Sequence, residues 1–87
     1  MNSSITHSFR KLLDALPQEA QDQARKQYQL WRRNHQHPSL HFKKVGEFWS
    51  ARVDDGHRVL GRAKDDTIYW FWIGNHREYE RIIRQSG

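Results

Sequence analysis

The chain has 87 residues, of which 36% are hydrophobic and 29% are charged, and its formal net charge at pH 7 is +5. This length is enough for a single domain, residues 1–87, and too short for two. The absence of cysteine excludes a disulfide framework and a zinc-thiolate site, and no apolar run is long enough to cross a membrane. With no signal-peptide core near its start, the sequence predicts a soluble, cytoplasmic protein. The excess of cations favours an anionic partner over a merely basic surface.

The first part of the chain predicts a short edge strand followed by two helices. Residues 3–7 read as the strand, and a helix is expected over 8–16. Pro17 interrupts the pattern and suits the first turn of a second helix that runs to about Asn34. Both helices have apolar residues at helical spacing, which are Phe9, Leu12, Leu13 and Leu16 in the first and Ala20, Ala24, Tyr28 and Trp31 in the second. Together they form a helical hairpin.

The second part predicts a sheet and one more helix. A loop over 34–40 contains Pro38, which cannot continue a helix. Strands are expected over 48–53, 57–63 and 67–73. A last helix begins near His76, with Asn75 as its cap and Glu78 three residues on in a capping-box arrangement. The predicted fold is α+β: an N-terminal helical hairpin packed on a small antiparallel sheet, with a short C-terminal helix.

The turn after Val53 decides which side chains share a face of this sheet, since a one-residue shift reverses them all. A two-residue Asp55-Gly56 turn would place Arg58 among apolar residues. We therefore expect a three-residue loop in which Gly56 is left-handed in a bulge. One face then holds Trp49, Ala51, Val53, Val59, Gly61, Ala63, Ile68, Trp70 and Trp72. The other holds Phe48, Ser50, Arg52, Arg58, Leu60, Arg62, Tyr69, Phe71 and Ile73.

The second of these faces has two interpretations. Aromatic rings beside guanidinium groups suit stacked bases and phosphates of RNA. Alternatively, the rings form a second small core with the stems of the arginines lying over it. His35, His37 and His41 also lie close together, but in a loop without acidic or thiolate support, so we expect no metal site.

The stretch "HPSLHFKKVGEFWSARVDDGHRVLGRAKDDTIYWFWIGNHREYERII", after a helical hairpin, resembles the RelE/ParE superfamily of toxins from bacterial type II toxin–antitoxin systems. The resemblance covers nearly the whole chain. It rests on the Pro-Ser-Leu and Lys-Lys stretch, the "ARV…HRVL" hairpin, and "WIGNHREY" leading into a final helix.

This resemblance implies a compact fold with a concave, basic sheet face. Many RelE-type members cleave mRNA in the ribosomal A site, without a metal or another cofactor, whereas ParE-type members inhibit DNA gyrase without nuclease chemistry. A partner antitoxin neutralises the toxin. Three functions follow as expectations: a ribosome-associated mRNA endonuclease, a gyrase inhibitor, or an inert member that only binds an antitoxin.

The resemblance also implies site residues. Arg58 matches the arginine that RelE-type nucleases use at the scissile phosphate, and His76 and Arg77 match a region that often holds a basic or histidine side chain. Tyr79 is a match to a C-terminal tyrosine. The expected catalytic residues are therefore Arg58, His76 and Tyr79, and the expected RNA-binding residues are Lys43, Lys44, Arg52, Arg62, Arg77, Tyr69 and Phe71.

The sequence departs from RelE at "FWSAR", where RelE itself has lysines. Each catalytic candidate also has a structural alternative. His76 suits a surface position in the first turn of a helix, Tyr79 suits a core position beside Ile82 and Ile83, and Arg58 suits an ion pair with an acidic residue of the last helix.

Overall fold

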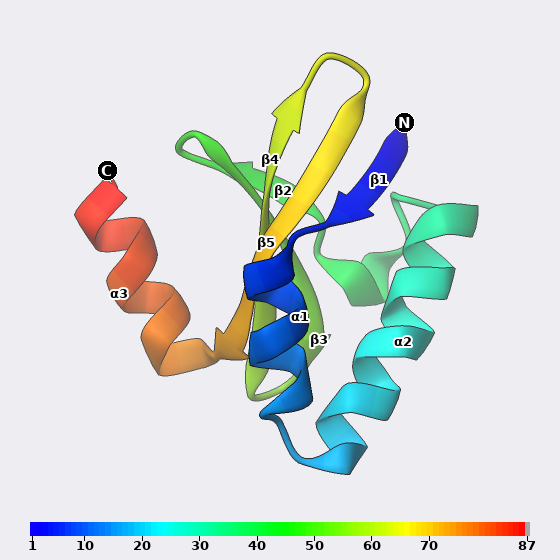
Figure 1. Ribbon diagram of the computed structural model, residues 1–87. Coiled ribbons are helices and arrows are strands. Elements are labelled where there is room, and N and C mark those ends of the chain that lie inside the picture. Colours follow the sequence, from blue (N-terminus) through cyan, green and yellow to red (C-terminus); the bar gives the residue numbers. More distant parts are fainter. Residues whose placement is uncertain (87) are drawn as a thin grey trace.

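The computed structural model describes residues 1–86 as one α+β domain with a five-stranded sheet. The elements in chain order are β1 (Asn2–Ile5), α1 (His7–Asp14), α2 (Gln18–Arg33), a 3-10 turn η1 (Pro38–Leu40), β2 (Lys43–Val45), β3 (Phe48–Asp54), β4 (His57–Lys64), β5 (Thr67–Asn75) and α3 (His76–Ser86). The strand order is β1-β5-β4-β3-β2 (Figure 1). The predicted fold class is confirmed, with two additions. The short strand β2 was not expected, and β1 runs parallel to β5, so the sheet is mixed.

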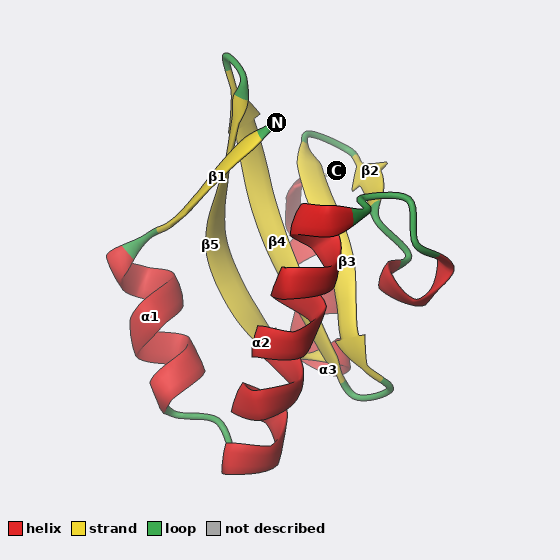
Figure 2. Cartoon of the chain, turned by 90° about the vertical axis from the view of Figure 1, so that its right-hand side faces the viewer, coloured by secondary structure: helices red, strands yellow, loops and turns green. Residues whose placement is uncertain are grey.

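The helical hairpin and α3 lie on opposite faces of the sheet (Figures 1 and 2). Helix α1 packs on β5 and α2 packs on β3. The local sequence explains where two of the helices begin. The Thr6 hydroxyl accepts a hydrogen bond from the Phe9 N–H at 3.1 Å, and the Asn75 side chain accepts one from the Glu78 N–H at 2.8 Å. The predicted role of Asn75 as a cap is thereby confirmed.

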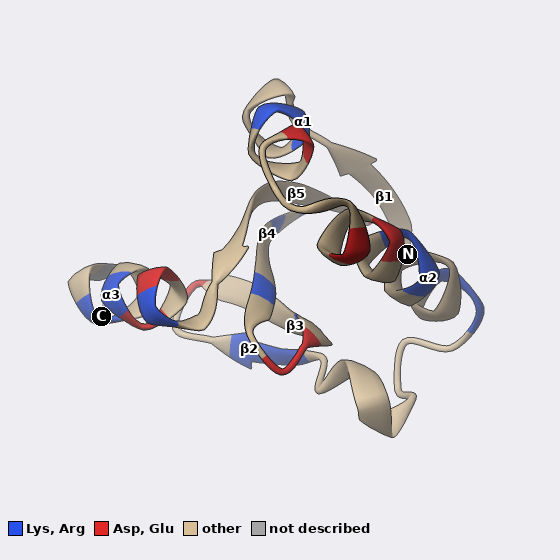
Figure 3. Ribbon diagram, turned by 90° about the horizontal axis from the view of Figure 1, so that it is seen from below, with Lys and Arg blue, Asp and Glu red and all other residues tan. Residues whose placement is uncertain are grey.

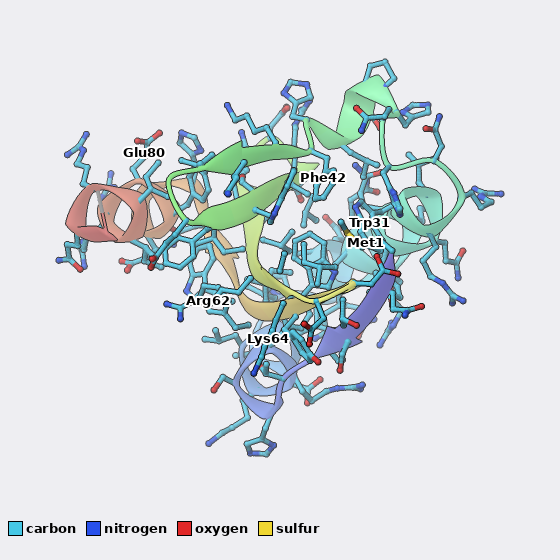
Figure 4. All side chains as sticks on the ribbon, turned by 90° about the horizontal axis from the view of Figure 1, so that it is seen from above. Met1, Trp31, Phe42, Arg62, Lys64 and Glu80 are labelled. Carbon is cyan, nitrogen blue, oxygen red and sulfur yellow. The ribbon has the colours of Figure 1, made fainter. Side chains whose placement is uncertain are left out.

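Trp31 of α2 is the central side chain of the core beneath the hairpin. Its ring meets Trp70 edge-on at 5.6 Å and Phe42 edge-on at 5.7 Å between centroids. Figure 4 shows Trp31 and Phe42 between α2 and the sheet. The buried members of this first core are Phe9, Leu13, Trp31, Leu40, Ala51, Val53, Ile68, Trp70 and Ile73. Each large apolar side chain that is fully buried stabilises the fold by about 1.5–3 kcal/mol.

The β3–β4 hairpin has the predicted register along most of its length but a different turn. Ala51 lies opposite Val59 and Arg52 lies opposite Arg58, as the three-residue loop requires. The prediction of a left-handed Gly56 is wrong, because no positive φ occurs there. Instead Asp54 lies opposite His57 and the register shifts between Arg52 and Asp54. The bulge therefore lies within β3 and not at Gly56. It still places Arg58 on the face opposite to the apolar one.

The β4–β5 hairpin contains a second shift that corrects the predicted faces. Gly61 lies opposite Trp70 as expected, but Leu60 lies opposite Trp72, so Phe71 is an extra residue in β5. Beyond this bulge every side chain changes face. Ile73 joins the core beneath the helical hairpin, while Trp72 joins the face of Leu60. Both residues were assigned to the opposite faces from the sequence.

Helix α3 covers a second, smaller core on that other face. Its buried members are Phe48, Leu60 and Tyr79, with Phe71, Trp72, Ile82 and Ile83 packed against them. Phe71 therefore follows the second interpretation of this face, in which the rings form a small core. Tyr69 remains 41% exposed on the surface.

Candidate functional site

One end of the sheet brings together the β3–β4 turn and the start of α3. The Gly56 carbonyl accepts a hydrogen bond from the His76 N–H at 2.9 Å. In the adjoining ladder His57 lies opposite Asn75 and Arg58 lies opposite Gly74. Two of the predicted catalytic residues, Arg58 and His76, therefore come from different strands and loops to the same end of the domain.

The Arg58 guanidinium is held by backbone carbonyls. Its Nη1 donates to the carbonyl oxygens of Asp54 at 2.7 Å and His57 at 2.9 Å, and reaches that of Asp55 at 3.5 Å. These acceptors are neutral, so they fix the side chain without cancelling its positive charge. Within residues 1–86, Nε and Nη2 of Arg58 make no hydrogen bond. An arginine fixed in this way presents two parallel donors to an anion such as a phosphate.

The acidic residues of α3 do not pair with Arg58. Glu80 contacts His76 at 3.1 Å, and Glu78 contacts Arg81 at 3.5 Å. The structural alternative for Arg58, an ion pair with the last helix, is therefore not what the structure shows.

The positive charges of the two other arginines on this face are each balanced by an acidic side chain. Arg52, directly opposite Arg58, forms an ion pair with Asp55. Arg62 lies 3.6 Å from the Glu47 carboxylate, and its guanidinium is 5.1 Å from the Phe48 ring centroid and 5.6 Å from that of Phe71. Figure 4 shows Arg62 directed away from Trp31 and Phe42. Among these three arginines, Arg58 alone has described partners that are all neutral.

His76 lies on the surface and Tyr79 beneath it. The His76 side chain is 48% exposed, its Nε2 lies 3.1 Å from Glu80 Oε1, and its ring stacks on Tyr79 at 5.8 Å. Tyr79 is only 6% exposed, and its hydroxyl accepts a hydrogen bond from Ser50 Oγ at 2.9 Å. Tyr79 thus lies in the core, as the structural alternative from its helical spacing predicts. Its ring packs beneath the imidazole of His76.

Asp54 organises the turn, a role that the sequence analysis missed. Its Oδ1 accepts from the Gly56 N–H and contacts His57 Nδ1, each at 2.9 Å. Partial burial alone would raise the pKa of Asp54. The hydrogen bonds from the His57 side chain and the Gly56 N–H, with the charge of His57, outweigh that effect and lower the pKa of Asp54 below its usual value. The signal was present in the sequence, since aspartate before a glycine turn often bonds the backbone two residues on.

The remaining predicted RNA-binding residues lie away from Arg58. Lys43 and Lys44 are exposed on the edge strand β2, opposite Ser50 and Trp49, so they point to different faces. Tyr69 lies opposite Arg62 near the other end of β5. Arg77 is exposed on α3, where cationic and anionic residues alternate (Figure 3).

The cleft between α1 and α2 is a second concave feature. A cavity of about 430 Å³ lies over the sheet there, lined by apolar side chains that include Phe9, Leu13 and Trp31. Two exposed arginines, Arg10 and Arg25, also line it. In the described residues no group of three or more histidine or acidic side chains is arranged to hold a metal ion, and no helix is long and apolar enough to span a membrane.

Comparisons with known proteins agree with this architecture. The ParE-like toxin domain family matches residues 18–81. A chain of the RelB-RelE antitoxin–toxin complex from Methanococcus jannaschii is 13% identical, with a TM-score of 0.70 over 90% of this chain and 95% of that chain. A chain of the RelBE2 toxin–antitoxin complex from Mycobacterium tuberculosis is 18% identical, with a TM-score of 0.65 over 86% and 96%.

The isolated RelE toxin of E. coli is 10% identical, with a TM-score of 0.62 over 97% of this chain and 96% of that chain. At such identities these structures establish a shared fold. No curated protein matches the sequence.

Proposed function

We propose that this chain, which belongs to the ParE-like toxin domain family, is the toxin of a type II toxin–antitoxin pair and inhibits translation by cleaving mRNA on the ribosome. The observation that carries the proposal is the Arg58 guanidinium, held by three carbonyls with its charge uncompensated. An arginine fixed before substrate arrives loses little entropy on binding and stabilises charge that develops on a phosphate.

The proposed reaction is attack of a ribose 2′-oxygen on the adjacent phosphorus. His76 accepts the proton of the 2′-hydroxyl, and Arg58 binds the phosphate oxygens as negative charge accumulates. The bond from phosphorus to the 5′-oxygen breaks, giving a 2′,3′-cyclic phosphate, and the 5′-oxygen takes a proton from solvent. Glu80 stabilises the imidazolium that forms, since it lies 3.1 Å from Nε2. Tyr79 acts as a positioning residue that holds the imidazole from beneath.

The remaining cations are proposed to bind the RNA backbone outside the cleavage position. Arg52 and Arg62 flank Arg58 along the sheet, and Arg77 extends the site along α3. Lys43 extends it to the edge of β2, while Lys44, which points to the other face, binds RNA only where the backbone passes around that edge. Tyr69 is the exposed ring of this region, while Phe71 supports Arg62 from within. The exposed cations contribute mainly sequence-independent affinity.

For the antitoxin partner we propose the cleft between α1 and α2. Its lining is mainly apolar, and the two exposed charged residues in it are arginines, Arg10 and Arg25. An amphipathic segment with acidic residues beside its apolar face complements both features. Two of the structural relatives are toxin–antitoxin complexes.

A second candidate function is inhibition of DNA gyrase. At the centre of β3, Ser50 is 2% exposed and Ala51 is 5% exposed, so this strand presents no lysine to a substrate where RelE has lysines. A toxin that acts by binding alone needs no such side chains.

The test compares message integrity during in vitro translation with gyrase supercoiling. We expect cleaved message and unaffected supercoiling for the wild type. Arg58→Ala and His76→Ala should each reduce cleavage by about 10²-fold or more. Arg33→Ala, on the exposed side of α2, is the matched control and should retain full activity. Blocked supercoiling with intact message would replace the nuclease proposal with the gyrase proposal.

A further inference from the structure

We propose that Trp72 and Arg58 form a two-point subsite for one nucleotide of single-stranded RNA, with a base stacked on the indole and the adjacent phosphate on the guanidinium. This subsite rests on the proposed function. The residue that stacks on the base is Trp72, which the sequence predicts in the core beneath the helical hairpin.

The position of Trp72 follows from two features of β5. The extra residue Phe71 moves Trp72 onto the face that also carries Arg58. A Cβ atom at Gly74 would lie 2.5 Å from Cζ2 of Trp72 and 2.9 Å from Cη2. The six-membered ring therefore occupies the space of a missing side chain at position 74. Gly74 lies directly opposite Arg58, so the indole covers the position of β5 that pairs with Arg58, on the same face of the sheet.

The indole of Trp72 is accessible in a way that two other indoles are not. Trp31 and Trp70 have N–H groups that are buried without a partner. The ring of Trp72 is only partly buried, and its N–H is not among the buried groups. Within the described residues that N–H makes no hydrogen bond, so it remains available to a base or a ribose.

A flat aromatic surface beside a fixed cation is the arrangement that proteins use to bind single-stranded nucleic acid. Every base has a π-face, so stacking tolerates different sequences, and the neighbouring arginine binds the phosphate.

The experiment measures binding of the full chain to a fluorescein-labelled, unstructured single-stranded oligoribonucleotide by fluorescence anisotropy. Inorganic polyphosphate, which offers phosphates without bases, is the second probe, and circular dichroism confirms folding. Trp72→Leu should weaken RNA binding by about 5- to 150-fold, the factor that corresponds to one stacked base, and should leave polyphosphate binding unchanged. Trp72→Phe, which keeps a smaller ring, should weaken RNA binding less.

Two further variants complete the design. Trp49→Leu removes a partly buried indole from the opposite face and should leave RNA binding unchanged. Gly74→Ala keeps Trp72 but forces its ring to move, so it should weaken RNA binding even if Trp72→Leu does not fold. If the wild type binds RNA and Trp72→Leu binds it equally well, the subsite is wrong and the proposed function stands. If the wild type fails to bind RNA, the subsite is also wrong, and message cleavage during in vitro translation decides the proposed function separately.

Discussion

Gly61 lies directly opposite Trp70, and the indole fills the space that a side chain at position 61 would need. A Cβ atom there would lie 2.8 Å from Cε3 of Trp70 and 3.0 Å from Cγ1 of Ile68. Both neighbours are almost completely buried, so neither has free space to move into. The glycine is therefore a packing requirement of the first core.

We expect Gly61→Ala to lower the free energy of unfolding by about 1–3 kcal/mol, because inserting a methyl group into a filled core forces its neighbours out of position. Gly56→Ala is the matched control. Its Cβ would meet only Asp54 Oδ1, at 3.8 Å, and its φ is not positive, so stability should change by less than about 0.5 kcal/mol. Urea denaturation measures both. Equal stabilities for the two variants would contradict this account of Gly61.

The hydrogen bond between Ser50 and Tyr79 attaches α3 to the sheet from within the second core. Both residues are almost fully buried and their oxygens are 2.9 Å apart. Ser50→Ala leaves the Tyr79 hydroxyl without a partner and should cost about 1–3 kcal/mol, as should Tyr79→Phe for the opposite reason. The double variant leaves neither group unpaired and should cost less than the sum of the two. Strict additivity in urea denaturation would show that the bond contributes nothing.

Periodicity was enough to predict the helices and most of the sheet. The helical hairpin has polar and apolar residues at clear intervals, and β3 and β4 alternate once the turn is placed. Those patterns correctly predict Trp31 and Trp70 as core residues. The cap at Asn75 is predicted separately, from its residue type just before the helix, and is also confirmed. Strand β2 has only three residues, two of them lysines, so nothing in its composition distinguishes it from a loop.

The bulge at Phe71 could not be predicted in the same way. Residues 68–73 read Ile-Tyr-Trp-Phe-Trp-Ile, and an apolar run without alternation does not define which residues share a face. The shift is set by tertiary packing, since Ile73 is 1% exposed beneath the helical hairpin and Trp72 fills the space over Gly74. For the same reason the sequence could identify Arg58 and His76 as candidates but not the carbonyl cradle that holds Arg58.

A charge reversal at the cleft tests the proposed antitoxin site. Arg10 is exposed, lines the cleft and has no described ion pair. Arg10→Glu should leave folding and toxicity intact but weaken binding of the cognate antitoxin by about 10-fold or more at low salt, with a smaller effect at high salt. Lys11→Glu, one residue along α1 and outside the cleft lining, controls for net charge. Equal loss in both variants, measured by calorimetry with the protein encoded by the adjacent gene, would mean that the antitoxin binds elsewhere.

The carboxylate of Asp54 should make the stability of the β3–β4 turn depend on pH. Since the His57 and Gly56 hydrogen bonds lower the pKa of Asp54 in the folded chain, the carboxylate stabilises the fold above the pKa of the unfolded state, about 3.9. That contribution is lost as the pH falls through the lower folded value. Wild type should therefore be more stable than Asp54→Asn at pH 5, and the difference should shrink steadily between about pH 4 and pH 2.

Asp22→Asn is the control for this pH dependence. Asp22 forms an exposed ion pair with Arg25 at 3.5 Å, where both side chains are 60% exposed, and such pairs contribute little because solvent screens them. Its stability difference from wild type should stay small at every pH. Thermal unfolding of the three proteins between pH 5 and pH 2 measures both differences. A stability difference between wild type and Asp54→Asn that stays constant or grows as the pH falls would contradict this account. The Asp54 carboxylate would then not be the charged acceptor that holds the turn whose backbone carbonyls bind Arg58.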